Sequence, residues 1–314
     1  MGTNNFLERT ATIFNVQKYN MYDGPGIRTL IFFQGCPLRC KWCANPEGLM
    51  KKYRVMFKKN LCSNCGECVN ICPVKKHKID SEGNHYIDKS VECIGCRKCE
   101  ETCINSCMKI VGEKKKISEL LEIIEEDRAF YETSNGGVTL GGGEVLMQPE
   151  AAISLLSACK NNCINTAIET CGYTTLETIK KVADYVDLFL FDLKQMDSEK
   201  HFYWTGVRNE QIIKNLEYLL ENNYNVHIRL PLLKGVNDSE EDIEKLANFL
   251  GKYRDYSNLK GVDLLPYHKL GVNKYLQLNE EYQIKNDPSL NEEDLKRIEN
   301  CIKKYDLPVK IVRH

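Results

Sequence analysis

The cysteine content constrains this chain more than any other feature of its sequence. Sixteen of the 314 residues are cysteine, and twelve of these fall between Cys36 and Cys107. Disulfide-dense scaffolds are typically short secreted domains, whereas this chain is long enough for a large core with an inserted module. Clustered cysteine in a chain of this length therefore indicates bound metal.

The first cysteine group is Cys36-x3-Cys40-x2-Cys43, which follows a predicted strand at Thr29–Phe33. A structural zinc site takes four ligands, usually as two separated pairs, and a [4Fe–4S] cluster normally takes four cysteines. Three thiolates therefore predict a cluster with one iron open to a small molecule. The spacing alone leaves open a zinc site with a distant fourth ligand.

Two further cysteine runs repeat the spacing of bacterial ferredoxins, Cys-x2-Cys-x2-Cys-x3-Cys. In two-cluster ferredoxins the fourth cysteine of each run ligates the other cluster. One predicted ligand set is Cys62, Cys65, Cys68 and Cys103, and the other is Cys93, Cys96, Cys99 and Cys72. Cys107 is an extra thiol that could replace Cys103. The remaining cysteines, predicted to be ordinary thiols, are Cys159, Cys163, Cys171 and Cys301.

The remainder of the chain alternates between helical and strand patterns. The predicted strands after the cysteine runs are Gly137–Leu140, Thr166–Thr170, Leu188–Leu193, Val226–Leu233, Val262–Tyr267 and Val309–Val312. The predicted helices are Ile117–Tyr131, Pro149–Asn162, Leu176–Val186, Gln211–Asn222, Ser239–Tyr253 and Asn291–Tyr305. Repeated βα units favour a parallel sheet with active groups on the loops after the strands. Residues 53–112 break this pattern and are interpreted as a metal-dependent insert, which leaves residues 1–52 and 113–314 as the main domain.

Charge and hydropathy exclude two classes of partner. The net charge is −1, so no basic field predicts binding to nucleic acid. No apolar run approaches the roughly 20 residues needed to span a bilayer, and residues 1–15 lack the apolar segment of a signal peptide. We therefore expect a cytoplasmic protein that binds neither nucleic acid nor membrane.

Polar and glycine residues stand where several predicted strands end. The turn Gly141-Gly142-Gly143-Glu144 would let backbone approach a ligand, and Glu144 could accept from an ammonium group. Four charged or titratable residues stand at or inside later strands, where ligand contacts are common in βα folds; they are Asp192, Lys194, Arg229 and His268. Taken singly, these residues are equally well explained by a tight turn, a capped strand or a core salt bridge.

Together these features resemble one enzyme family. Cys-x3-Cys-x-aromatic-Cys, with Trp42 as the aromatic residue, resembles the radical S-adenosylmethionine (SAM) enzymes. Tyr22-Asp-Gly-Pro-Gly-Ile-Arg28 before it and Asn45-Pro-Glu47 after it are similar to the glycyl radical enzyme activating enzymes. The resemblance implies an α/β fold, a partial (β/α)6 TIM-like barrel. It also implies an inserted ferredoxin-like domain with two [4Fe–4S] clusters, which makes three clusters in all.

The resemblance also implies roles for individual positions. Catalytic roles fall to Cys36, Cys40, Cys43 and Asp23, the last near an incoming glycine loop. Gly142, Gly143 and Glu144 would hold the amino group of SAM. The other residues implied to lie near SAM or the reacting centre are Trp42, Asp192, Lys194, Arg229 and His268. Glu169 and Thr170 match a cation site of the family, although Glu169 stands where the family usually has Asp.

The implied activity is the activation of a partner enzyme. One electron from the reduced cluster would cleave SAM, and the resulting 5′-deoxyadenosyl radical would take a hydrogen atom from a glycine of the partner. The implied partners are a glycyl radical enzyme and a flavodoxin or ferredoxin donor, and the chain is expected to be a monomer. The alternatives are another type of radical SAM enzyme, an electron carrier fused to an inert barrel, and a zinc-stabilised binding module.

Overall fold

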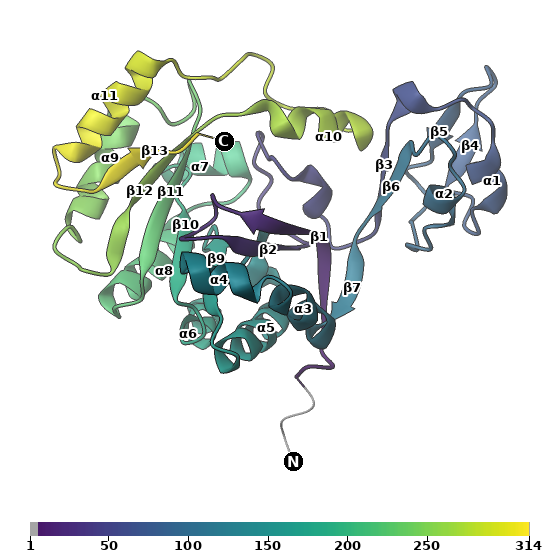
Figure 1. Cartoon of the computed structure of the whole chain (residues 1–314). Coiled ribbons are helices and arrows are strands. Elements are labelled where there is room, and N and C mark those ends of the chain that lie inside the picture. The colour runs from purple at the N-terminus through teal and green to yellow at the C-terminus, as the bar shows by residue number, and fades with distance from the viewer. Residues whose placement is uncertain (1–5, 314) are drawn as a thin grey trace.

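A nine-stranded sheet forms the centre of the computed structural model, which describes residues 6–313. Its strand order is β13-β12-β11-β10-β9-β8-β2-β1-β7 (Figure 1). Neighbouring strands are parallel from β2 to β13 and antiparallel at β1–β2 and β1–β7. The strands are β1 Thr10–Asn20, β2 Arg28–Phe33, β7 Glu113–Lys116, β8 Gly137–Gly142, β9 Asn165–Thr170, β10 Leu188–Asp192, β11 Val226–Leu232, β12 Leu259–Pro266 and β13 Val309–Ile311.

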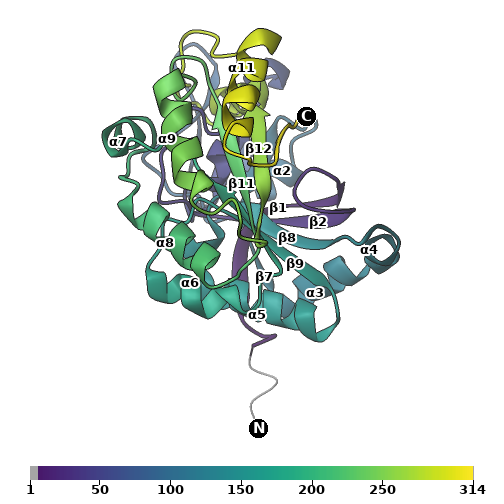
Figure 2. The ribbon, with the colours of Figure 1, turned by 90° about the vertical axis from the view of Figure 1, so that its left-hand side faces the viewer.

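Helices cover the outer face of the parallel strands, as Figure 2 shows for α6, α8 and α9. The inner strands are buried on both faces. The face toward the helices is apolar, whereas the interior face carries buried polar side chains such as Arg28, Thr139 and Arg229. Hydroxyl and amide side chains cap several of these helices, for example Ser239, which accepts from the Asp242 N–H at 3.2 Å. The helices of this part are α3 Ile117–Glu125, α4 Arg128–Ser134, α5 Pro149–Asn161, α6 Leu176–Ala183, α7 Ser198–Thr205, α8 Glu210–Glu221, α9 Glu240–Gly251, α10 Val272–Gln277 and α11 Glu292–Lys303.

The predicted α/β fold with a mostly parallel sheet is confirmed, and the arrangement is consistent with a partial TIM-like barrel. One predicted helix, Ile117–Tyr131, is wrong because the segment forms two helices, α3 and α4, which are separated at Asp127. The buried Asp127 carboxylate accepts from the Thr29 hydroxyl at 2.6 Å, which ties the break to β2. No element was predicted from the sequence at β1, β7, α7 or α10.

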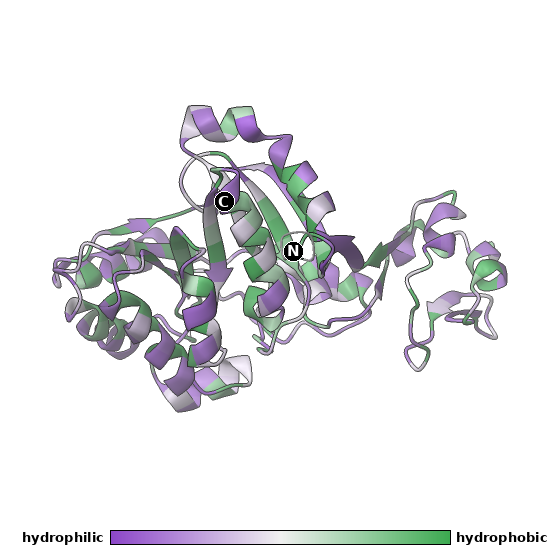
Figure 3. Ribbon diagram, turned by 90° about the horizontal axis from the view of Figure 1, so that it is seen from below, coloured by the Kyte–Doolittle hydropathy of each residue, from purple (hydrophilic) through white to green (hydrophobic). Residues whose placement is uncertain are grey.

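A smaller lobe lies between residues 54 and 111 and extends to the right of the sheet in Figure 1. Its own buried core is small and includes three cysteines, which are Cys68, Cys99 and Cys107. Figure 3 shows that the longer apolar stretches belong to the large sheet and its helices. The elements of the lobe are β3 Arg54–Phe57, α1 Glu67–Ile71, β4 His77–Ile79, β5 His85–Ile87, α2 Lys98–Glu101 and β6 Met108–Val111. A core this small is typical of folds that depend on bound metal.

Within residues 6–313, we find no helix with the length and apolar character needed to cross a membrane.

Candidate active site

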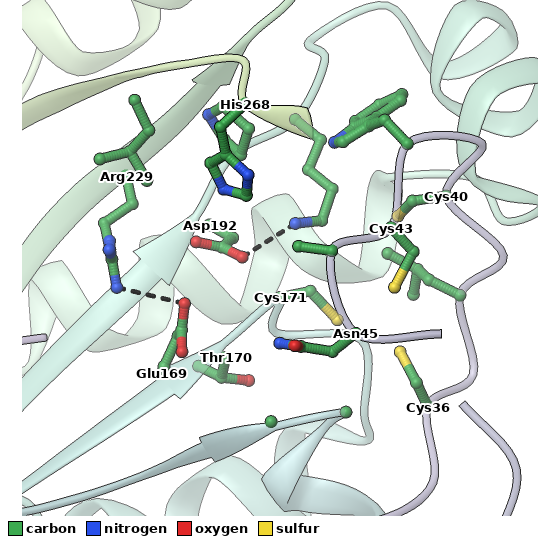
Figure 4. A pocket seen from close by; sticks show the side chains of 18 of the residues that line it. Cys36, Cys40, Cys43, Asn45, Glu169, Thr170, Cys171, Asp192, Arg229 and His268 are labelled. Atoms are coloured by element: carbon green, nitrogen blue, oxygen red, sulfur yellow. Dashed lines mark hydrogen bonds and ion pairs between the residues drawn. The ribbon is translucent and has the colours of Figure 1, made fainter. Parts of the chain in front are cut away.

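A cavity of about 270 Å³ opens at the carboxyl ends of the parallel strands. This volume lies near the lower end of the roughly 300–1,000 Å³ typical of ligand pockets. The predicted site residues that line it are Asp23, Cys36, Cys40, Trp42, Cys43, Gly142, Gly143, Asp192, Lys194, Arg229 and His268. Figure 4 shows the sulfur atoms of Cys36, Cys40 and Cys43 facing one part of this space. The fold therefore gathers residues that are up to 245 positions apart in the sequence (268 − 23).

Helix α7 holds the loop that carries the three cysteines. The backbone N–H of Arg39 donates to the Thr205 carbonyl at 2.6 Å, and that of Lys41 donates to the Trp204 carbonyl at 3.1 Å. The Lys41 ammonium lies 3.4 Å from the centre of the Tyr203 ring, a cation–π contact. The sequence signals for α7 were an N-cap at Asp197 and a C-terminal glycine in the left-handed region.

Helix α10 holds the other end of the same loop. The Lys274 ammonium forms an ion pair with Glu47 at 2.6 Å and donates to the Asn45 side chain at 2.8 Å. Gly271 lies against the Cys43 carbonyl, where an added Cβ would approach to 2.6 Å. The Asn45-Pro-Glu47 motif thus connects the cysteine loop to α10.

The three thiols lie together and are half-buried, and their donor set fits an iron–sulfur cluster. Burial raises the pKa of Cys36 and of Cys40, and it raises the pKa of Cys43 to about 12. Three adjacent thiolates would therefore need a positively charged partner inside the cavity. A bound metal supplies that charge, because a coordinating thiol is deprotonated outright.

Three ion pairs form the wall that faces the cysteines. Arg229 is 3% exposed and contacts Asp23 at 2.7 Å and Glu169 at 3.1 Å. Lys194 contacts Asp192 at 2.8 Å, and dashed lines in Figure 4 mark this pair and the contact of Arg229 with Glu169. Burial opposes the charge on Lys194, but Asp192 and the cysteines hold its pKa above the usual range.

This wall also contains polar atoms that its own ion pairs do not satisfy. Within residues 6–313, Nε of Arg229 and Oδ1 of Asp192 are buried and have no hydrogen-bond partner. Buried polar groups in native proteins are nearly always paired. Because neither atom has accessible surface in this arrangement, a polar ligand could reach them only after a side-chain shift.

The cysteines of the smaller lobe line two separate cavities. One is lined by Cys62, Cys65, Cys68, Cys103 and Cys107. The other is lined by Cys72, Cys93, Cys96 and Cys99. The fourth cysteine of each run thus lies with the first three of the other run, as the predicted ligand sets require. Within the first cavity the sulfur atoms of Cys103 and Cys107 are 3.1 Å apart.

Comparison with protein families matches three parts of the chain. Residues 94–250 match the radical SAM superfamily. Residues 54–104 match a 4Fe-4S dicluster domain, and residues 22–78 match a 4Fe-4S single cluster domain. The first match covers much of the sheet, and the other two cover the cysteine runs.

Three relatives extend over most of the chain. The choline trimethylamine-lyase activating enzyme of Oleidesulfovibrio alaskensis (strain ATCC BAA-1058 / DSM 17464 / G20) is 62% identical, over 98% of this chain and 100% of that protein. The chain belongs to the radical SAM glycyl radical enzyme activating enzymes. The trans-4-hydroxy-L-proline dehydratase activating enzyme of Clostridioides difficile is 40% identical, over 95% and 98% of the two chains. The isethionate sulfite-lyase activating enzyme of the same Oleidesulfovibrio strain is 37% identical, over 86% and 87%.

As a member of this family the chain is an enzyme that activates glycyl radical enzymes through radical chemistry on SAM. The family membership also establishes iron–sulfur and SAM cofactors. An inert barrel fused to an electron carrier and a zinc-stabilised binding module therefore do not describe the whole chain.

Glu144 was predicted to contact SAM, but its side chain does not line the cavity. It is 1% exposed, and its carboxylate accepts from four groups at 2.8–3.0 Å: Leu146 N–H, Thr170 O–H, Cys171 N–H and Cys171 S–H. Burial raises the pKa of Glu144, and these hydrogen bonds oppose that rise. In this arrangement Glu144 connects the ends of β8 and β9.

The preceding glycines pack against the cysteine loop. Gly142 has a φ of 109°, and a Cβ on Gly143 would lie 2.4 Å from the Gly35 carbonyl oxygen. The N–H of Glu144 donates to that same carbonyl at 2.7 Å. Close backbone approach, which requires glycine, thus places the turn directly beside Cys36.

The structure adds contacts to two predicted assignments near β9. Cys171, predicted to be an ordinary thiol, lines the cavity and donates to Glu144 at 2.9 Å; its position directly after a strand was the available signal. Glu169 and Thr170, the predicted cation site, also line the cavity. One oxygen of Glu169 already contacts Arg229, and the Thr170 hydroxyl donates to Glu144.

The Asp23–Arg28 segment is fixed by buried contacts. Arg28 is 0% exposed and donates to the Thr139 hydroxyl at 2.7 Å and to the Val138 carbonyl at 2.6 Å. Asn20 donates to the Asp23 carboxylate at 2.8 Å. Arg28 therefore serves the structure, while Asp23 is held at the cavity beside Arg229.

Proposed function

We propose that this activating enzyme acts on a choline trimethylamine-lyase. The relative named for that partner aligns over its whole length and is far more similar to this chain than the relatives named for hydroxyproline or isethionate partners. Four sequence segments resemble the choline trimethylamine-lyase activating enzyme most, and they are residues 137–145, 167–173, 224–241 and 263–275. They supply Gly142, Gly143, Cys171, Arg229 and His268 to the cavity. The second candidate partner is an isethionate sulfo-lyase.

Cys36, Cys40 and Cys43 would hold a [4Fe–4S] cluster, with SAM in the remaining cavity. When bound, the cluster and SAM supply the 5′-deoxyadenosyl radical that removes a hydrogen atom from the partner's glycine. The shared cavity carries this placement, because Asp192, Lys194 and Arg229 line it together with the three cysteines. Trp42 and His268 would enclose the same ligand, and Glu144 would position the glycine turn.

Asp23 would orient the glycine loop of the partner at the mouth of the cavity. Its side chain is 14% exposed and paired with Arg229, so it stays in place when the loop enters. Met21 and Tyr22 immediately before it are 65% and 48% exposed. Exposed apolar side chains next to a catalytic cavity are typical of protein-binding surfaces.

The smaller lobe, residues 53–112, would hold two further [4Fe–4S] clusters in the two cysteine-lined cavities. The grouping of Cys72 with Cys93, Cys96 and Cys99 supports the exchanged ligand sets. This lobe would pass electrons from a flavodoxin or ferredoxin to the main domain, residues 1–52 and 113–314. We further propose that the enzyme is a cytoplasmic monomer, in keeping with sixteen free cysteines.

Incubation with purified partners tests the proposed function. The chain is reconstituted anaerobically with iron and sulfide, reduced, and mixed with SAM and either a choline trimethylamine-lyase or an isethionate sulfo-lyase. We expect the glycyl radical doublet in the electron paramagnetic resonance (EPR) spectrum of the choline lyase, and none with the Cys40→Ala variant. A doublet formed only in the isethionate enzyme would refute the choline assignment.

A further inference from the structure

Two buried histidines lie between the cavities of the smaller lobe. His85 lines the cavity of the five cysteines, and His77 lines the cavity of the other four. Nδ1 of His77 is 3.1 Å from Nε2 of His85, and the two residues are 1% and 3% exposed. A hydrogen-bonded imidazole pair therefore connects the walls of two sulfur-lined cavities.

The β4–β5 hairpin places this pair. Ile79 faces His85, and His77 faces Ile87 in the antiparallel register. The two histidines are therefore diagonal neighbours on one face of the hairpin, and that face is turned toward the cysteines. Tyr86, on the opposite face, is 43% exposed.

One end of the pair is fixed to the loop of Cys62. Nδ1 of His85 is 3.9 Å from the Cys62 sulfur. The backbone N–H of His85 donates to the Asn64 side chain at 3.0 Å, and the Asn64 N–H donates to the same sulfur at 3.4 Å. A cluster-bound thiolate can only accept, so Nδ1 of His85 would be the donor. Its Nε2 would then accept from Nδ1–H of His77.

The other end lies by the second cavity, at the junction with the main sheet. The N–H of Lys76, directly before His77, donates to the Cys72 sulfur at 3.4 Å. Arg97 in this cavity donates to the Gly112 carbonyl at 3.2 Å, and Gly95 packs against the Tyr53 ring. The second cavity is therefore on the side of the main sheet.

A zinc site is the competing interpretation. One ligand atom each from Cys68, His77 and His85 lies within 4.8 Å of the others, and all three residues are buried. Structural zinc takes four ligands at about 2.0–2.3 Å. Cys68 also belongs to a ferredoxin-type run, so its sulfur is already assigned to a cluster.

We propose that His85, supported by His77, donates a hydrogen bond to the cluster at Cys62 and raises the reduction potential of that cluster. Hydrogen bonds to cluster sulfur favour the reduced state, whose negative charge is larger. The pair takes up no electron or proton itself. This inference rests on the proposed function, in which the lobe holds two clusters.

EPR-monitored redox titration of the fully loaded chain tests this inference, with iron, sulfide and zinc counted in each sample. His85→Phe keeps an aromatic ring beside Phe57, whose ring centre is 4.7 Å away, but loses the donor. We expect it to disfavour reduction of one lobe cluster by about tenfold, equivalent to 59 mV for one electron. His77→Phe should give a smaller shift of the same sign, His85→Gln should partly restore the potential, and the hairpin control Tyr86→Phe should change nothing.

An unchanged potential in fully loaded His85→Phe would overturn the inference. Iron loss from the lobe in both His85→Phe and His85→Gln would also overturn it, because His85 would then be required for the cluster itself. Stoichiometric zinc in the wild-type chain would favour the Cys68–His77–His85 site instead. If the wild-type lobe held no clusters, the proposed function of the lobe would be refuted. If the clusters were present but the potential did not change in His85→Phe, only the inference about His85 would be refuted.

Discussion

Glu144 provides the sharpest test of how the cavity is built. The structure predicts that it positions the glycine turn, whereas the sequence motif predicts direct contact with the amino group of SAM. In Glu144→Gln the shape is kept, but the amide NH2 faces the Cys171 N–H, which donated to a carboxylate oxygen at 2.9 Å. A buried donor left unsatisfied costs about 1–3 kcal/mol. Because the glycine turn must shift to relieve this cost and must return for SAM to bind, we expect a roughly 10- to 100-fold loss of SAM affinity.

The assay measures equilibrium binding of SAM and of an analogue without the amino group to both variants of the loaded enzyme. If Glu144 acts through the turn, a shift of the turn also moves Gly35 and the cysteine loop, so Glu144→Gln weakens both ligands. If it contacts the amino group, the loss vanishes with the analogue, and that result would refute our interpretation. Glu150→Gln, on the exposed side of α5, is the matched control and should bind both ligands normally.

Three further changes probe the remaining parts of the site. Gly143→Ala places a Cβ 2.4 Å from the Gly35 oxygen, so the cysteine loop must shift and SAM binding should fall at least tenfold by equilibrium dialysis. Lys194→Met leaves the buried Asp192 without its partner at 2.8 Å; breaking a buried pair costs about 3–5 kcal/mol, and production of 5′-deoxyadenosine should fall below a hundredth. Cys103→Ala should remove one [4Fe–4S] cluster, which metal analysis would detect as a loss of about four iron atoms per chain. An unchanged iron count would assign the ligand to Cys107, whose sulfur is 3.1 Å from that of Cys103.

The sequence was most informative where a segment is buried on both faces. The strands from β8 to β12 are mostly buried and carry apolar residues at their helix-facing positions, so their positions were predicted within a few residues. β1 is half-exposed and mixes polar with apolar residues, which gives no clear period. α7 is short and weakly amphipathic, so only its caps distinguish it from a loop.

For the site, local motifs identified residues but not their contacts. Cys36, Cys40 and Cys43 follow one strand, so spacing alone predicted their proximity. The hydrogen bonds of Glu144 depend on how β8 and β9 pair, with Cys171 brought to it by the parallel register. Such a contact across strands 27 residues apart has no periodic signal in the sequence.

Charge balance connects the cavity to its ligand. Three carboxylates line it, on Asp23, Glu169 and Asp192, and the lysine and arginine there are Lys194 and Arg229. With all three carboxylates ionised, the Asp, Glu, Lys and Arg side chains of this wall carry one negative charge in excess, and a proton on Glu169 brings them to zero. SAM carries a net positive charge because its sulfonium adds to a balanced amino acid. In a cavity of low dielectric the attraction is several times stronger than in water, so the enzyme should bind SAM more tightly than its neutral products.

We expect Glu169 to release a proton when SAM binds. Burial raises the pKa of Glu169 to about 8, with Arg229 opposing and the Asp23 and Asp192 carboxylates adding to the rise. Near pH 7 the free enzyme therefore holds a proton there, and a cationic ligand lowers the pKa and expels it. Calorimetry of SAM binding in two buffers of different ionisation heat should show release of up to one proton, with affinity rising toward pH 8. Glu169→Gln should abolish the release, and a buffer-independent heat in the wild-type enzyme would contradict this assignment.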